Sequence, residues 1–279
     1  MSYDNNNFNP TDNSPSDNEW NRRVWNDGFN DEPVSNNLDL TSVAYDTIDM
    51  TQHSAFDLSK INFEENVLSQ SFLFMMVALV ITAFTSYYVS SSPKLLVSLV
   101  LNPGVFYGLM FAEIIIVMIN NVTVRKNMLI PSALLFTAYS VINGITLSII
   151  FIVYTSSSIV TTFFVAAAMF GGMAVYGLVT KRNLSSIGNI LLMALWGIII
   201  ASLVNIFIKS SAMEMALNYI CVLIFVGLTA YDTQKIKTMS FYTDSDNVTC
   251  VALMGAIELY LDFINIFIRL LSIMGKRRR

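Results

Sequence analysis

Long apolar runs, separated by short polar joints, fill most of the chain after residue 65. Crossing the hydrocarbon core of a bilayer takes about 20 helical residues, and seven runs reach that length. Only helices and closed barrels satisfy their backbone groups in lipid, and these runs are too long for barrel strands. The predicted spans are Asn66–Tyr88, Leu95–Asn120, Ile130–Tyr154, Ser158–Thr180, Ile187–Ile208, Met215–Ile236 and Val248–Ile273.

The joints between the runs set the fold class. Short joints such as Ser90–Lys94 and Lys181–Ser186 force neighbouring helices to run antiparallel. The sequence therefore predicts an all-α integral membrane protein, with a seven-transmembrane-helix bundle over residues 66–275. The second run is interrupted by Asn-Pro-Gly at 102–104, so its continuous helix is expected to begin at Val105.

Composition separates a tail from this bundle. The chain is 54 % hydrophobic and 13 % charged, which is typical of a membrane protein. Residues 1–65, however, hold thirteen acids and three bases and are rich in Asn, Asp and Ser. Such a segment buries too little apolar surface to fold alone. We therefore expect residues 1–65 to form a disordered acidic tail.

Basic residues predict the orientation of the bundle, because cytosolic loops carry an excess of Lys and Arg. Loops on the side of the N-terminus hold six bases, whereas loops on the other side hold only Lys94 and Lys209. The N-terminal tail is therefore expected to be cytosolic. The basic C-terminal tail, residues 276–279, disagrees with this rule if the last helix crosses fully. Either there are seven full crossings, or the last run re-enters and returns to the cytosol.

Two aspartates stand in this apolar setting. Asp232 lies at the cytosolic end of the sixth run, and Asp262 lies inside the seventh. Glu258, Asp262, Asn265 and Arg269 are spaced +4, +3 and +4, which puts them on one face of a helix. A charge at the centre of a spanning helix costs roughly 2.5–3.5 kcal/mol, so ionisable groups there usually have a function. The polar face suits a helix at the centre of the bundle.

A carboxylate pair explains these residues best. A short loop joins the sixth and seventh runs, so Asp232 and Asp262 are able to meet. Two carboxylates at close range do not both ionise cheaply, so they share a proton and titrate as a unit. Such a pair senses pH and also offers oxygen ligands to a hard cation such as Ca²⁺. The structural alternative is that each aspartate only docks helices through Arg269, a loop lysine or backbone N–H groups.

Further charged groups have two interpretations each. Glu113 stands alone in the second run, where it is a candidate ion-pathway residue with Glu258 and Asn265, or a partner of Arg269. Arg125 and Lys126 follow the same run and are candidate basic partners of the aspartate pair. Their other interpretation is a plain topology signal.

The residues around the two aspartates also resemble a known family. Gly227–Ile236 and Ala256–Leu271 are similar to the paired aspartate motifs of the transmembrane Bax inhibitor motif family, closest to its lifeguard branch. Ala138–Leu147 and Glu113 are supporting matches, and the resemblance covers about residues 60–279.

That resemblance implies a fold and a function. It implies seven helices with the last one central, and a pH-sensitive calcium leak across internal membranes such as the endoplasmic reticulum or Golgi. Asp232 and Asp262 match the family's two-aspartate sensor. For eukaryotic members it also implies suppression of cell death, with apoptosis-related proteins as partners. Calcium would be the transported ion, and neither a cofactor nor a nucleic-acid partner is expected.

Two alternatives come from other functional classes. An intramembrane aspartyl protease also uses two aspartates, but it needs glycine before the second one, where this chain has Leu259, Tyr260 and Leu261. No nucleophile, zinc or nucleotide motif occurs either, so we do not expect an enzyme. A non-conducting scaffold would act through the tail, where Trp20 and Trp25 lie among acids.

Overall fold

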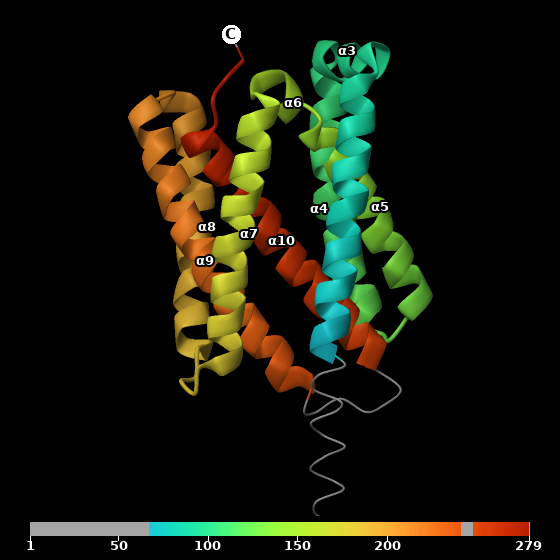
Figure 1. The fold of residues 1–279 in the computed structure, drawn as a ribbon, viewed down its shortest axis with the longest axis vertical. Helices are drawn as coiled ribbons and strands as arrows, with labels where there is room; N and C mark the ends of the chain where they lie inside the picture. Colours follow the sequence, from blue (N-terminus) through green and yellow to red (C-terminus); the bar gives the residue numbers. More distant parts are fainter. Residues whose placement is uncertain (1–66, 241–247, 279) are drawn as a thin grey trace, which may run out of the picture. The chain divides into compact units, whose positions relative to one another are not determined.

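The computed structural model describes residues 67–240 and 248–278, and all long elements in these ranges are helices (Figure 1). The predicted tail at residues 1–65 lies outside them. The helices are Val67–Ser91, α3 (Pro93–Leu101), α4 (Pro103–Arg125), α5 (Leu129–Leu147), α6 (Ile150–Val153), α7 (Ser156–Val179), α8 (Ser185–Ile208), α9 (Ser211–Ser240) and α10 (Val248–Met274).

Seven of the described helices are long and apolar enough to span a membrane, as predicted, with α5 and α6 counted as one span. The prediction for the second span was wrong at both ends. Asn102 separates the short helix α3 from α4, and α4 starts at Pro103 rather than Val105. Proline suits the first position of a helix, because a backbone N–H there would have no hydrogen-bond partner within the helix. α4 then continues to Arg125, past the predicted end at Asn120.

The sixth span is also longer than predicted. α9 ends at Ser240 rather than Ile236, so Asp232 lies about two turns inside the helix instead of at its end. The side chains of Thr229 and Thr233 are fully buried on either side of this aspartate. Asp232 is therefore held inside a regular helix whose neighbouring turns are packed.

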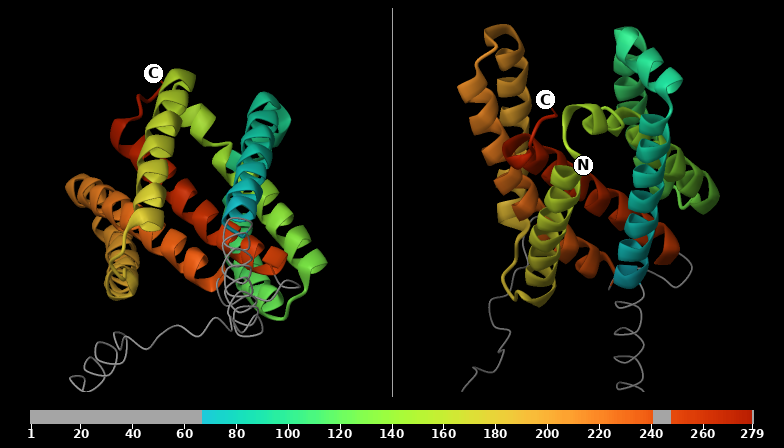
Figure 2. Two further views of the ribbon diagram at one scale, coloured as in Figure 1. Left: turned by 60° about the horizontal axis from the view of Figure 1, so that its bottom comes forward. Right: turned by 45° about the horizontal axis from the view of Figure 1, so that its top comes forward.

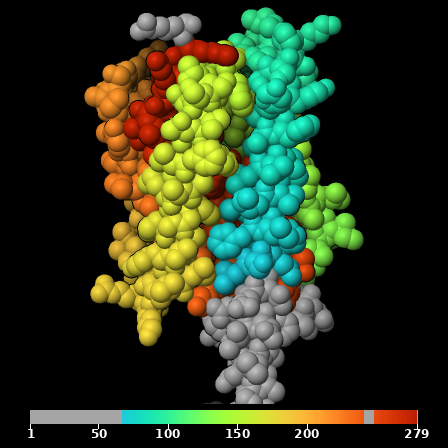
Figure 3. All heavy atoms as spheres, viewed as in Figure 1, coloured from blue at the N-terminus to red at the C-terminus, as the bar shows by residue number. Residues whose placement is uncertain are grey.

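The last helix lies at the centre of the bundle, as the family resemblance implies. In α10, 67 % of the most apolar stretch is buried, compared with 6 % in α4 and in α8. α10 packs against α9, α7, α5 and α4, and Figure 2 shows it running obliquely among the other helices. On the face drawn in Figure 3, α7 and the helix Val67–Ser91 lie in front of α10 and hide most of it.

The C-terminal segment shows that α10 runs the full length of the bundle. The backbone N–H of Thr155 donates to the carbonyl of Lys276 at 3.0 Å, and the N–H of Arg278 donates to Val153 at 2.9 Å. Both bonds join the C-terminus to the α6–α7 turn, which lies at the opposite end from the α7–α8 turn (Figure 1). Of the two predicted alternatives, this placement of the end of α10 fits the full crossing, because a re-entrant helix would return toward the α7–α8 turn.

Two glycines let α7 and α8 approach α9 closely. A Cβ atom on Gly177 of α7 would lie 2.3 Å from the carbonyl oxygen of Ala230. A Cβ atom on Gly188 of α8 would lie 2.5 Å from the ring of Tyr231. Ala230 and Tyr231 directly precede Asp232, so the two close contacts hold the part of α9 that carries this aspartate.

Candidate functional site

Asp232 and Asp262 meet where α9 packs along α10. Asp262 is only 3 % exposed, and Asp232 is partly exposed. Their carboxyl groups lie within hydrogen-bonding reach of each other. A hydrogen bond between two carboxyl groups requires a proton on one of them. The geometry therefore fits a pair that holds one proton.

Thr229 is a further contact of Asp262. Its hydroxyl lies within hydrogen-bonding reach of that carboxyl, but it donates its own proton to the carbonyl of Phe225 at 2.8 Å. A hydroxyl has one proton, so Thr229 is left as an acceptor for Asp262. The Oδ2 atom of Asp262 is buried without a hydrogen-bond partner. These surroundings suit a neutral Asp262 better than an ionised one.

An ion pair forms a second contact between the same two helices. Lys235 Nζ lies 2.5 Å from Glu258 Oε1, and the two side chains are 31 % and 22 % exposed. Lys235 follows Asp232 by three residues, and Glu258 precedes Asp262 by four, so both pairs face the same antiparallel interface. Two polar contacts thus lie one turn apart between α9 and α10.

The charges at this interface do not balance. Among residues 67–240 and 248–278, Asp232, Glu258 and Asp262 have one base beside them, Lys235, which is paired with Glu258. Glu258 Oε2 is also buried without a hydrogen-bond partner. Full ionisation would therefore leave two acids without a compensating charge, and a bound proton or water removes that cost.

The predicted basic partners lie elsewhere. Arg269 Nη1 donates to Asn218 Oδ1 at 3.2 Å. Arg125 and Lys126 are exposed at the end of α4. In the ranges 67–240 and 248–278, none of the three forms an ion pair. The base beside the aspartates is Lys235, which lies on the same helix as Asp232.

Glu113 belongs to a separate polar cluster on the other side of α10. Its carboxylate accepts hydrogen bonds from Thr146 Oγ1 at 2.7 Å and Asn143 Nδ2 at 3.3 Å. Tyr260 donates its hydroxyl proton to Asn143 Oδ1 at 3.1 Å and contacts Thr82 Oγ1 at 2.6 Å. Glu113 is therefore not a partner of Arg269, and hydroxyl and amide groups satisfy it instead.

Asn265, the remaining predicted pathway residue, forms a hydrogen bond within its own helix. Asn265 Nδ2 donates to the carbonyl of Leu261 at 2.8 Å, one turn earlier on α10. Within the described part of the chain, no three His, Cys, Asp or Glu side chains form a group that would hold a metal ion.

Sequence reasoning missed Lys235 and Tyr260. Lys235 was counted among the six loop bases that set the orientation, and a loop lysine was considered as a partner of the aspartates without being singled out. Lys235 lies three residues after Asp232 and Glu258 lies four residues before Asp262, so each is about one turn from its aspartate on antiparallel helices. Tyr260, which is fully buried, was interpreted only as a bulky neighbour of Asp262. Two residues apart on α10, Tyr260 and Asp262 point to different sides, so the central helix has a second polar face.

Comparison with known proteins supports the family that the two aspartate motifs suggested. The family model described as "Inhibitor of apoptosis-promoting Bax1" matches residues 64–279. The "Inner membrane protein YbhL" of Escherichia coli is 45 % identical over 217 residues, which cover 77 % of this chain and 93 % of that protein. An uncharacterized protein of Borreliella burgdorferi is 38 % identical over 233 residues, covering 83 % and 99 %. The chain therefore belongs to the transmembrane Bax inhibitor motif family.

Proposed function

We propose that this membrane protein is a pH-sensitive calcium leak channel gated by the Asp232–Asp262 pair. The observation that carries the proposal is the meeting of two carboxyl groups inside the α9–α10 contact, where the nearby base, Lys235, is paired with Glu258. With one shared proton, the pair joins α9 to α10 and holds the passage closed.

Loss of the shared proton would supply a large part of the energy of a conformational switch. Two like charges about 4 Å apart repel by roughly 4 kcal/mol at an effective dielectric constant of about 20. About 5.5 kcal/mol converts a 1:99 equilibrium to 99:1. Protonation of this pair is therefore able to shift α9 and α10 substantially between a joined and a separated state.

Calcium would pass along the polar groups that α10 carries or contacts. Glu258 and Asp262 supply carboxylate oxygens on one side of α10, and Asn265 continues that face one turn later. Glu113 supplies a carboxylate on the other side, in the cluster with Asn143 and Thr146. Oxygen ligands of this kind, completed by water, suit Ca²⁺.

The cellular part of the proposal rests on the family and on charge placement. We propose a cytosolic N-terminus, supported by the six bases in loops on that side. We also propose a role in calcium homeostasis and in the suppression of cell death. The membrane would be an internal one, which is where the family resemblance places eukaryotic members. The Escherichia coli relative is named an inner membrane protein.

The test is calcium efflux from proteoliposomes across a pH series. Wild-type protein should release calcium at a rate that changes with pH. The Asp232→Asn, Asp262→Asn double variant keeps a hydrogen-bonding pair without a titratable proton, so its rate should not change with pH. Glu214→Gln is the matched control, because this acid is exposed near the start of α9. A double variant with unchanged efflux and unchanged pH dependence would place the gate elsewhere.

A further inference from the structure

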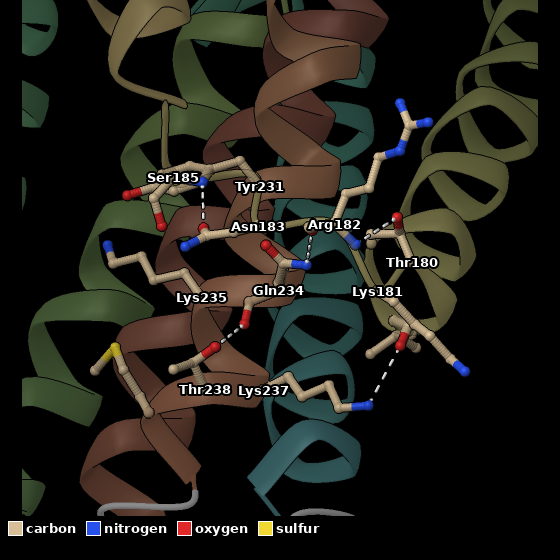
Figure 4. Close-up of a pocket in the computed structure, with 13 residues that line it drawn as sticks. Thr180, Lys181, Arg182, Asn183, Ser185, Tyr231, Gln234, Lys235, Lys237 and Thr238 are labelled. Atoms are coloured by element: carbon tan, nitrogen blue, oxygen red, sulfur yellow. Dashed lines mark hydrogen bonds between the residues drawn. The ribbon is translucent and has the colours of Figure 1, made fainter. Parts of the chain in front are cut away.

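A basic pocket lies beside the aspartate site, between the α7–α8 turn and the last turns of α9 (Figure 4). Its volume is about 410 Å³. Four of its lining residues are bases and none is an acid; the bases are Lys181, Arg182, Lys235 and Lys237. Such a concentration of positive charge favours an anionic ligand.

Side chains from α9 hold the α7–α8 turn in place. Gln234 Oε1 accepts a hydrogen bond from the backbone N–H of Leu184 at 2.8 Å, and Gln234 Nε2 donates to the carbonyl of Arg182 at 2.9 Å. Lys237 Nζ donates to the carbonyl of Leu178 at 3.3 Å. The wall of the pocket is thus fixed before any ligand arrives, which lowers the entropy cost of binding.

The bases of the turn are available to a ligand. Lys181 and Arg182 are exposed, and within the described residues neither forms an ion pair. In Figure 4, their side chains extend on one side of Gln234 while Lys235 lies on the other. The charged ends of Lys181 and Arg182 point in different directions in Figure 4, and each sits on a long side chain. A guanidinium or an ammonium group at such a position suits the charge of a phosphate group.

The pocket also lies at a suitable depth. It is bounded by the end of α7 at Val179, the start of α8 at Ser185 and the last residues of α9, which are the ends of three candidate spans. Lipid headgroups lie at the ends of spans, and basic pockets between transmembrane helices bind acidic headgroups.

We infer that this pocket binds a phosphate-bearing ligand through Lys181 and Arg182. The phosphate group comes from one of two sources: the headgroup of an acidic phospholipid, or a soluble phosphate. Lys235 lines the pocket and also pairs with Glu258. It is therefore kept unchanged in the test, which measures binding and needs no ion flux.

The experiment measures the affinity of the full-length protein for two probes. Native mass spectrometry gives the Kd for phosphatidic acid, with phosphatidylcholine as the reference lipid, and calorimetry gives the Kd for inorganic phosphate. Lys181→Gln with Arg182→Gln should raise the Kd about thirtyfold, since each base near the surface contributes roughly a factor of five. Lys181→Arg with Arg182→Lys keeps both charges and should bind within a few-fold of wild type.

The matched control removes the same charges outside the pocket. Arg125→Gln with Lys126→Gln also deletes one arginine and one lysine, both exposed at the end of α4, and should leave the Kd unchanged. Binding of phosphatidic acid alone identifies the lipid headgroup as the source, and binding of inorganic phosphate as well identifies a soluble ligand. If neither probe binds, or if the control weakens binding as much as the pocket variant, the inference is overturned.

Discussion

Replacing Lys235 with glutamine should weaken the contact between α9 and α10. The substitution leaves Glu258 without its ion-pair partner, and the Oε2 atom of Glu258 already has no hydrogen-bond partner. Removing one partner of a fully buried pair costs about 3–5 kcal/mol, whereas exposed pairs contribute about 0.2–1 kcal/mol. The side chains here are 31 % and 22 % exposed, so we expect an intermediate loss of about 2 kcal/mol in the free energy of unfolding.

A double-mutant cycle isolates the pair. The free energy of unfolding would be measured by reversible titration with a denaturing detergent in mixed micelles, for wild type, Lys235→Gln, Glu258→Gln and the double variant. We expect a coupling energy of about 1–2 kcal/mol, well above the error of about 0.3–0.5 kcal/mol in additivity. Lys126→Gln, at an exposed position, should change stability by less than about 0.5 kcal/mol. A coupling energy within the additivity error would refute the reasoning.

Two further substitutions test the packing around the site by the same unfolding measurement. Gly188→Ala places a Cβ atom 2.5 Å from the ring of Tyr231 and should cost about 1–3 kcal/mol, whereas Gly171→Ala, with open space around it, should cost nothing; equal effects would contradict the close contact. Tyr260→Phe removes a buried hydroxyl that forms two hydrogen bonds and should cost about 1–3 kcal/mol, whereas Tyr219→Phe, 52 % exposed, should stay within about 0.5 kcal/mol. A loss for Tyr260→Phe no larger than for Tyr219→Phe would argue against the buried cluster.

The sequence predicts the helices well because span length and hydropathy are local properties. The seven spans were found, and the polar face of α10 correctly indicated a central helix. The errors lie at the helix ends, where single residues decide where a helix begins or stops. Pro103 starts α4 directly after the break at Asn102, and α9 continues past Asp232 to Ser240, beyond the point where hydropathy falls.

Partners of the polar groups were predicted less well, because they depend on how helices rotate and slide against each other. The sequence offered Arg269, Arg125 and Lys126 as bases for the aspartates, and all three lie elsewhere. Lys235 was counted among the loop bases, whereas in the structure it lies inside α9 and pairs with Glu258. Tyr260 resembles any apolar residue in a hydropathy pattern, and only packing brings its hydroxyl to Asn143.

The protonation of Asp262 is the most direct test of the central claim, that the two aspartates share a proton. Infrared difference spectroscopy of the full-length protein in lipid detects the carbonyl band of a protonated carboxyl group as the pH is raised. The proposal predicts a band that disappears with rising pH, that persists in Glu113→Gln and that is absent in Asp262→Asn. A spectrum without such a band, or a band unaffected by Asp262→Asn, would contradict the shared proton and with it the proposed gate.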